Sequence, residues 1–207
     1  MSVANTIKGN PALKKIVHRM LIPKDSARPR LWVSMFLNRF FHKRQKGSMI
    51  HKRARLDVVP FNRFDLGANS TIEDFCIINN GVGDVIIGNN TLIGIGNVII
   101  GPLTIGNNVI LAQNIVVSGL NHEYKDPLVP IRFQHVTTAA ITIADDCWIA
   151  ANAVITAGVT IGKHCIIGAG AVVTKDIPPF SVAAGNPARV VKRYDESLKE
   201  WVQVNYS

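Results

Sequence analysis

The sequence predicts an all-β solenoid, in which short strands and tight turns stack coil upon coil. From residue 143 to residue 177, a β-branched apolar residue recurs at every sixth position and is followed by a small residue or Thr. The position four residues after each of these aliphatics is also small or apolar. A strict period of six fits neither a helix, which repeats at three and four, nor a flat strand, which alternates by two. A short strand, a turn and another short strand give this period, which is typical of a parallel β-helix.

The chain begins with a strongly basic segment, residues 1–56. This segment holds fourteen Lys and Arg residues against a single acidic residue, Asp25, and therefore carries a net charge of +13. The whole chain carries +9, so residues 57–207 carry −4. A basic arm on a mildly acidic body indicates an anionic partner for the arm.

The apolar pattern of the arm predicts two amphipathic helices, over residues 11–22 and 31–42. Two interpretations remain open for them. The helices either cover an exposed end or side of the solenoid, or place the aromatic stripe of residues 32–41 in the headgroup region of an anionic membrane. No nucleic-acid recognition motif accompanies the charge, so we expect no nucleic-acid partner.

Fifteen hexads follow the arm and predict one solenoid domain over residues 57–183. Their leading aliphatics are Leu66, Ile72 and Ile78, then Ile87, Ile93, Ile99, Ile105, Leu111 and Val117, then Ile143, Ile149, Ile155, Ile161, Ile167 and Val173. Asn89-Asn90 and Asn107-Asn108 fall in the turns, where Asn and Gly tolerate the left-handed backbone of a tight corner.

The hexads are interrupted once at length, by residues 118–142. A long irregular excursion from a rigid scaffold is where binding and catalytic residues usually lie. This excursion holds two histidines, His122 and His135. After the last hexads, residues 184–207 form a C-terminal tail, and Asp195 is a candidate cap for a short helix over residues 195–206.

Composition and the positions of the cysteines argue against a membrane-spanning protein, a secreted protein and a metal enzyme. No run of about 18 apolar residues predicts a membrane span, and no apolar leader with a cleavage site is evident, so we expect a cytoplasmic protein. Cys76, Cys147 and Cys165 all fall four residues after a leading aliphatic, which predicts buried free thiols. A zinc enzyme on the same scaffold would need three converging histidines, and His122, His135 and His164 lack that spacing, so no metal is expected.

The hexads, the histidine in the excursion and the closing Ala184-Gly-Asn-Pro-Ala-Arg189 resemble the hexapeptide-repeat acetyltransferases. The likeness covers about residues 60–193 and is strongest to the maltose/galactoside and polysaccharide O-acetyltransferases. It implies a left-handed β-helix of about five coils, with three hexads in each coil. It also implies acetyl-CoA as cosubstrate, a homotrimer, and active sites in the grooves between neighbouring subunits.

The resemblance also implies roles for particular residues. His122 matches the catalytic histidine of the family, whose neutral imidazole removes the proton of the acceptor and later protonates the leaving thiolate. The positions that match the acetyl-CoA groove are Trp148, Ala151, Ala169, Thr174, Lys175, Arg189 and Lys192. Small residues there let the pantetheine arm approach the backbone, and the cations would meet the CoA phosphates.

Two departures bear on the acceptor. Gly94 stands near the position where the galactoside branch has a sugar-contacting Asn, and the basic arm differs from the N-terminal segment of that branch. Both features favour a sugar of a surface polysaccharide or lipopolysaccharide precursor, lipid-linked at the cytoplasmic face of the membrane. The alternatives left open are N-acetylation of an amino sugar, an antibiotic or serine, and a non-catalytic scaffold.

Overall fold

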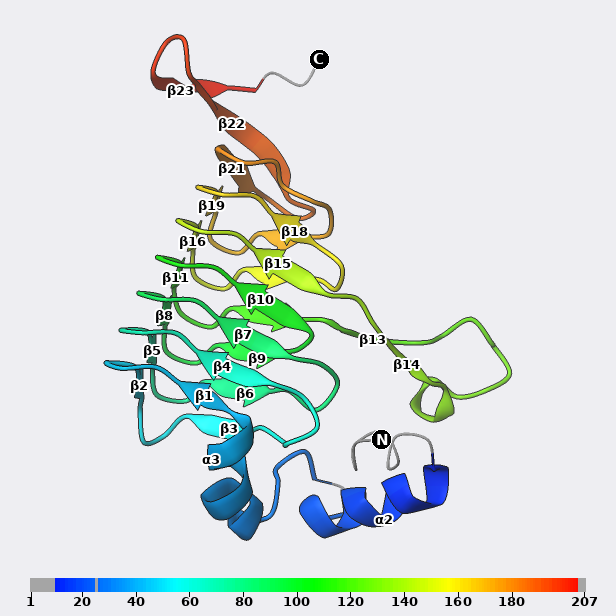
Figure 1. The fold of residues 1–207 in the computed structure, drawn as a ribbon. Helices are drawn as coiled ribbons and strands as arrows, with labels where there is room; N and C mark the ends of the chain where they lie inside the picture. Colours follow the sequence, from blue (N-terminus) through cyan, green and yellow to red (C-terminus); the bar gives the residue numbers. More distant parts are fainter. Residues whose placement is uncertain (1–9, 25, 205–207) are drawn as a thin grey trace.

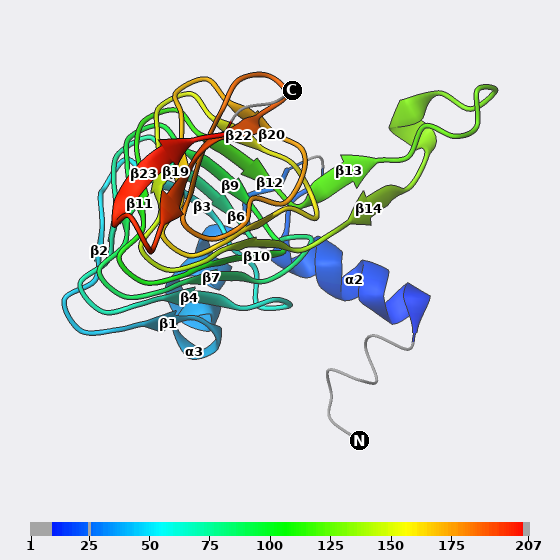
Figure 2. The ribbon, with the colours of Figure 1, turned by 90° about the horizontal axis from the view of Figure 1, so that it is seen from above.

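The protein is a parallel β-solenoid with a helical arm at its N-terminal end and a hairpin that projects from its side (Figure 1). The computed structural model describes residues 10–24 and 26–204. Three sheets form the sides of the solenoid, and the chain visits them in turn, so three consecutive strands make one coil. Seen from above, the chain turns clockwise as it rises toward the viewer, which makes the solenoid left-handed (Figure 2).

The strands of each side pair in parallel with their equivalents in the next coil. Sheet A consists of β1 (Lys43–Arg44), β4 (Phe64–Leu66), β7 (Val85–Ile87), β10 (Leu103–Ile105), β15 (Ile141–Ile143) and β18 (Thr160–Ile161). Sheet B begins with β2 (Met49–Ile50), β5 (Thr71–Ile72), β8 (Leu92–Ile93), β11 (Ile110–Leu111), β16 (Trp148–Ile149) and β19 (Ile166–Ile167). Sheet C consists of β3 (Arg55–Asp57), β6 (Ile77–Asn79), β9 (Val98–Ile100), β12 (Val116–Ser118), β17 (Val154–Ile155) and β20 (Val172–Val173).

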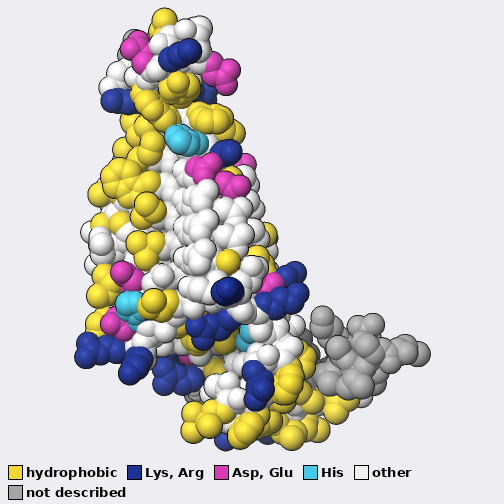
Figure 3. Space-filling model, turned by 60° about the vertical axis from the view of Figure 1, so that its left-hand side comes forward, with side chains coloured by type: hydrophobic (Ala, Val, Ile, Leu, Met, Phe, Trp, Pro, Cys, Tyr) yellow, Lys and Arg dark blue, Asp and Glu magenta, His cyan; other side chains and the backbone are white. Residues whose placement is uncertain are grey.

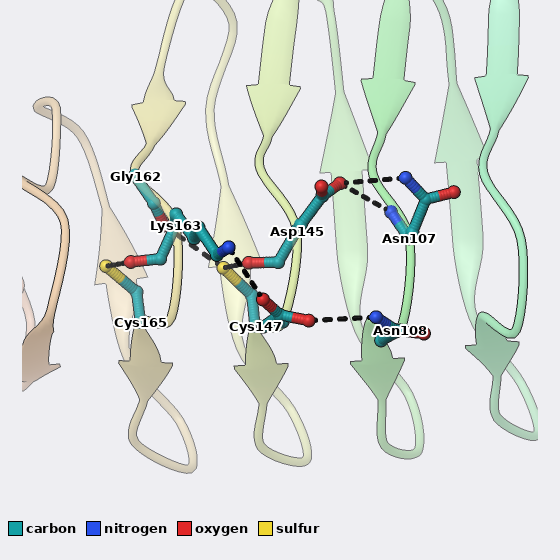
Figure 4. A network of polar contacts seen from close by, with 8 residues as sticks. Asn107, Asn108, Asp145, Cys147, Gly162, Lys163 and Cys165 are labelled. Carbon is teal, nitrogen blue, oxygen red and sulfur yellow. Dashed lines mark hydrogen bonds and ion pairs between the residues drawn. The ribbon is translucent and has the colours of Figure 1, made fainter.

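The leading aliphatics of the hexads form the core. All fifteen are buried, with at most 2% of their surface exposed. Cys76, Cys147 and Cys165 are likewise buried and free, so the prediction of buried thiols is confirmed. The Cys147 Sγ donates to the Gly162 carbonyl oxygen at 3.1 Å in the next coil (Figure 4). Burial raises the pKa of the Cys76 thiol, because the charged form loses its hydration.

A polar ladder runs along the corner between sheets A and B. Asn90, Asn108 and Asp146 stack at this corner with φ values of 53°, 57° and 62°. The Asn108 amide donates to the Asp146 carboxylate at 2.9 Å, and Lys163 of the next coil lies 3.3 Å from the same carboxylate (Figure 4). The Asn108 hydrogen bond and the nearby Lys163 together lower the pKa of Asp146. The predicted left-handed turn residues are thus confirmed, and their side chains link one coil to the next.

The solenoid has six coils rather than the five expected. Residues 43–57 form the first coil through β1, β2 and β3, although the charge pattern assigned residues 43–56 to the arm. Arg44 pairs with Leu66 and Ile50 pairs with Ile72, so the period of six starts earlier than predicted. The pattern was hidden because Arg44 stands where the other coils have an aliphatic.

The predicted helices are present in the arm, as α2 (Pro11–Leu21), η1 (Val33–Leu37) and α3 (Asn38–Phe41). The Asn10 side chain caps α2 by accepting hydrogen bonds from the backbone of Ala12 and Leu13. The helices lie at the N-terminal end of the solenoid (Figure 1), and their inner side packs on Val59 beyond the first coil. One side of the arm therefore packs on the body of the protein, as the first interpretation expects, and contact of the arm with a membrane stays a prediction.

The C-terminal tail is a β-hairpin, and the predicted helix over residues 195–206 is wrong. β21 (Ser181–Ala184) continues sheet B and is followed by antiparallel β22 (Arg189–Asp195) and β23 (Glu200–Gln203). Asp195 caps a turn, not a helix, by accepting hydrogen bonds from the backbone of Ser197 and Leu198. The edge strand β21 offers unpaired backbone N–H and C=O groups, and β22 gains hydrogen bonds by pairing with it. A short isolated helix is only marginally stable, so the tail forms strands instead. Residues 205–207 lie outside the described part.

Candidate functional site

The excursion at residues 118–142 is a hairpin that stands away from the coils. β13 (Leu120–His122) and β14 (Val136–Thr138) pair antiparallel, and the short helix η2 (Ile131–Phe133) lies in the loop between them. The hairpin leaves the solenoid at the corner between sheets C and A and extends sideways (Figures 1 and 2). Gln134 organises the loop, because its amide donates to the carbonyl oxygens of Asp126 and Val129 at 2.8 and 2.7 Å.

His122 ends β13 and is exposed. Its backbone is fixed by pairing with Val136 across the hairpin. The two neighbouring carboxylates are engaged elsewhere: Glu123 lies 3.6 Å from the Lys125 ammonium, and Asp126 accepts from the Leu128 backbone at 2.9 Å. The His122 imidazole therefore stands on a fixed backbone, available to a ligand from outside the hairpin.

His135 directly precedes β14, and its neighbour Val136 is the residue that pairs with His122. Val136 pairs with His122, and successive side chains of a strand point to opposite faces. His135 lies opposite Glu123 across the hairpin, because the Glu123 backbone N–H donates to the His135 carbonyl oxygen at 2.9 Å. Strand alternation extended to His135 would place the two histidines on opposite faces of the hairpin.

The residues predicted to line a cosubstrate groove lie on the last two coils and beyond. Trp148 stands on the outer face of sheet B, half exposed, in register between Ile110 and Ile166. Ala151 and Ala169 lie in stacked turns at the corner between sheets B and C, where the Gly170 backbone donates to the Ala151 carbonyl oxygen at 2.9 Å. A Cβ on Gly170 would meet nothing within 4 Å, so this corner is open to an extended ligand.

The polar and cationic positions lie around the top of the solenoid. Thr174 and Lys175 are exposed and follow β20, at the corner between sheets C and A. Arg189 and Lys192 lie on β22, and Arg189 donates to the neighbouring Ala188 carbonyl oxygen at 2.9 Å.

The structure therefore divides the predicted site between different edges of one chain. The hairpin with His122 leaves from the corner between sheets C and A, whereas Ala151 and Ala169 lie at the corner between sheets B and C. A triangular solenoid keeps its corners apart, so a single chain does not assemble the predicted residues around one point. No three His, Cys, Asp or Glu side chains converge as metal ligands within residues 10–24 and 26–204.

The outer faces of the three sheets differ in polarity. The outward positions of sheet A include Thr104, Thr142 and Thr160 in register. Most outward positions of sheets B and C are apolar, although Thr71 and Arg55 share their registers. The apolar positions include Met49, Ile110 and Trp148 on sheet B, and Ile77, Val98, Val116, Val154 and Val172 on sheet C. Ile110 is 48% and Val116 is 36% exposed. The sequence could have indicated these two faces, because the residue directly before each leading aliphatic points outward and is mostly apolar on sheets B and C. The hexad analysis used only the inward positions.

Comparisons with known proteins agree with this architecture. A family model described as bacterial transferase hexapeptide (six repeats) matches residues 140–175, and a model of the hexapeptide repeat of succinyl-transferase matches residues 84–118. The galactoside O-acetyltransferase of Escherichia coli (strain K12) is 35% identical over 104 residues, which are 50% of this chain and 50% of that protein. The chain thus spans about half the length of this curated relative.

Solved structures resemble the chain over a greater length. A maltose O-acetyltransferase from Clostridium difficile 630 superposes with a TM-score of 0.53 and 27% identity, over 92% of this chain and 88% of that chain. AntD, an N-acyltransferase from Bacillus cereus in complex with dTDP and 3-hydroxybutyryl-CoA, superposes with a TM-score of 0.64 over 80% and 90% of the two chains. Its 20% identity shows a shared fold alone. The six left-handed coils built from hexads, together with the matches to both hexapeptide models, show that the chain has the hexapeptide-repeat fold and resembles the bacterial transferases that these models describe.

Proposed function

We propose that this protein is an acetyl-CoA-dependent O-acetyltransferase that acts on a sugar or glycan precursor, with His122 as general base. The observation that carries the proposal is the position of His122. One long excursion interrupts the hexads, and it presents this imidazole on a paired strand, clear of the coils. A purely structural solenoid gains nothing from such an interruption.

The chemistry follows from the properties of imidazole. A neutral imidazole at His122 accepts the proton of the acceptor hydroxyl while the oxygen forms a bond to the thioester carbonyl carbon. The carbon–sulfur bond breaks, and the imidazolium returns the proton to the leaving thiolate. The products are the acetyl ester and the free thiol, so atoms and charge balance without a metal or redox partner.

The residues of the last coils suit an acetyl-CoA molecule, whose thioester supplies the acetyl group. The open corner at Ala151 and Ala169 admits an extended pantetheine arm, with Trp148 on the adjoining face of sheet B. Thr174 lies at the corner between sheets C and A, where a longer part of the cosubstrate would reach it. Lys175, Arg189 and Lys192 supply cations near the top of the solenoid, where hydrogen bonds to phosphates are charge-assisted.

We propose a cyclic homotrimer as the form that completes the site. A ring of identical subunits uses two different surfaces of each subunit, and this chain has two apolar outer faces, on sheets B and C, beside a polar one on sheet A. Packing one subunit against the next would bring the His122 hairpin of one copy toward the Ala151 corner of another. This arrangement resolves the separation of His122 from the groove residues within one chain.

The proposed acceptor is a sugar of a surface polysaccharide or lipopolysaccharide precursor. At Gly94, any added Cβ would lie 2.6 Å from the Ala112 carbonyl oxygen and 2.7 Å from that of Leu111. The backbone therefore excludes a sugar-binding side chain at this position, which disfavours a galactoside or maltose acceptor. The basic arm suits an acceptor held by a lipid at the cytoplasmic face of a membrane, with the protein in peripheral contact. No helix in the described residues is both long and apolar enough to cross a membrane.

The test is incubation with radiolabelled acetyl-CoA and a panel of sugars, nucleotide sugars and lipid-linked glycans. We expect label in a sugar acceptor, released by mild alkali, because an acetyl ester is labile there and an amide is not. Alkali-stable label would assign the protein as an N-acetyltransferase instead. Calorimetric titration with CoA is the companion measurement, and absence of binding would favour a non-catalytic scaffold.

A further inference from the structure

The outer side of the helical arm exposes an unusual number of large apolar side chains. We call this surface the outer face of the arm, and it comprises Ile16, Met20, Leu31, Trp32, Met35, Phe36, Phe40 and Phe41. Their exposed fractions run from 42% for Trp32 to 76% for Phe40. Figure 3 shows hydrophobic side chains gathered over the base of the molecule, with Lys and Arg side chains among and around them. Apolar patches of this kind mark interaction sites in soluble proteins.

The exposure is a consequence of the fold, since the opposite side of the arm is packed. Leu21, Ile22, Val33 and Val59 form a small core, and Val33 is completely buried. The Asn38 amide is buried and donates to the Val58 carbonyl oxygen at 2.9 Å, which ties α3 to the segment after the first coil. The arm is thus attached by one side and presents the other.

Cations accompany the apolar side chains on this surface. A shallow groove of about 530 Å³ is lined by Ile16, Arg19, Met20, Arg30 and Trp32. Arg30 reaches across to α2 and donates to the Arg19 carbonyl oxygen at 3.4 Å, which brings the two arginines to one groove. Farther along, the Arg39 guanidinium lies 5.2 Å from the centre of the Phe40 ring. Guanidinium groups bind phosphate oxygens strongly, and the apolar walls suit acyl chains.

Charge complementarity identifies the occupant as an anionic surface. Within the described residues, Arg19, Arg30 and Arg39 make no ion pair, whereas Arg28 and Arg55 both pair with Asp57. Asp25 is the single acidic residue among residues 1–56, so a second copy of the arm would meet like charge. Helices with an apolar face and a cationic rim are typical of segments that lie in the interface of an anionic bilayer.

We propose that the outer face of the arm docks on a bilayer of anionic phospholipid, with a lipid phosphate held between Arg19 and Arg30. Trp32, Phe36 and Phe40 then enter the headgroup and upper acyl region, and the remaining cations contact neighbouring phosphates. The His122 hairpin and α2 lie on the same side of the solenoid (Figures 1 and 2). Docking would therefore hold the proposed catalytic hairpin near the membrane surface.

The docking surface is independent of the proposed catalysis, because it contains none of the proposed site residues. Lipid binding can fail while acetyl transfer succeeds, and the reverse is also possible. The experiment uses the full chain, since deletion of residues 1–56 would remove the first coil, β1 to β3, together with the arm.

The test is co-sedimentation with vesicles of phosphatidylcholine alone or mixed with phosphatidylglycerol. We expect binding to the mixed vesicles to be stronger by at least about tenfold, and to weaken as salt is raised. In brominated lipid, quenching of tryptophan fluorescence is expected for the natural chain and lost in Trp32→Phe, while Trp148 and Trp201 remain in both.

Matched variants separate the two components of the surface. Arg19→Gln with Arg30→Gln should weaken binding by roughly tenfold or more, whereas Arg193→Gln with Lys199→Gln, at the other end of the solenoid, should leave it unchanged. Phe36→Ser with Phe40→Ser should abolish binding, whereas Leu198→Ser should not. An unaltered circular dichroism spectrum and melting temperature of each variant show that it has folded.

Three outcomes would overturn the proposal. They are equal binding to both kinds of vesicle, equal loss in the arginine pair and its control, and concentration-dependent self-association that Phe36→Ser with Phe40→Ser abolishes. The last would assign the outer face to protein contact between copies.

Discussion

The coils and the two segments that leave them use their side chains in opposite ways. In the coils, the leading aliphatics are at most 2% exposed, and their repetition forms one continuous core. In the arm and the hairpin, Phe40 is 76%, Phe133 is 75% and Leu128 is 90% exposed. The difference teaches that the apolar side chains inside the coils stabilise the fold, whereas those of the arm and the hairpin remain exposed and contribute little to the core. Substitutions in the two kinds of region should therefore have separable effects.

The largest expected effect is on catalysis and comes from the hairpin. His122→Ala should reduce acetyl transfer by roughly a hundredfold to ten-thousandfold, because the acceptor hydroxyl loses its base. The melting temperature should stay the same, since the side chain is exposed and makes no contact with the core. His135→Ala, at the start of the returning strand of the same hairpin, is the matched control and should retain most activity. Equal losses in the two variants would contradict the assignment of His122.

The largest expected effect on stability comes from the core of the coils. Ile149→Ala should lower the free energy of unfolding by about 2–5 kcal/mol, because it leaves a cavity in a fully packed interior. Leu128→Ala removes a side chain of the same size from the hairpin and should change stability by no more than about 0.5 kcal/mol. Urea unfolding at one fixed protein concentration measures both, since subunit association would otherwise shift the midpoint. Comparable losses would remove the distinction between coil and excursion.

A smaller effect on the free energy of unfolding is expected from His42, at the junction between the arm and the coils, and it depends on pH. Burial lowers the pKa of His42, an effect that the nearby Asp65 carboxylate partly opposes. The folded pKa is therefore below the unfolded value of 6.5, so the unfolded chain binds a proton first as pH falls. The resulting loss of stability begins as pH falls through the unfolded pKa and grows toward the folded pKa.

Neither ring nitrogen of His42 has a hydrogen-bond partner within the described residues, so a phenyl ring can replace the imidazole. His42→Phe should raise the melting temperature at pH 5.5 by more than at pH 8, and should keep the edge contact with Phe64. A gain of about 1 kcal/mol corresponds to about 2–4 °C in a chain of this size. His135→Gln controls for the loss of one histidine. A pH-independent difference between His42→Phe and the natural chain would contradict this explanation.

The smallest effect concerns the polar ladder of the coils. Asp146 is ionised in the ladder, and its lowered pKa means that this contribution to stability is lost as pH falls through the folded value. Asn108→Gly, which keeps the left-handed backbone, should raise the pKa of Asp146 more than Lys163→Met does, because the Asn108 hydrogen bond is its strongest stabilising contact. NMR titration of the carboxyl carbon measures both values. A greater shift in Lys163→Met would reverse the ranking.

Periodicity alone determined most of the fold. Each leading aliphatic repeats a local strand and turn, so the register from Leu66 to Val173 could be read from spacing without knowledge of distant contacts. The buried cysteines and the left-handed Asn corners followed from the same register. The position of His122 outside the register likewise followed from the interruption at residues 118–142.

Tertiary structure alone decided the rest, because it depends on which edges and faces meet. The first coil was missed because Arg44 breaks the apolar pattern, and only pairing with Leu66 shows that residues 43–57 belong to the solenoid. The tail became a hairpin because β21 offered a free edge that the residues 195–206 do not reveal by themselves. The separation of His122 from the Ala151 corner could not be predicted from the sequence either. Local spacing determines each turn, whereas the packing of the three sheets into a triangle determines which corners are neighbours.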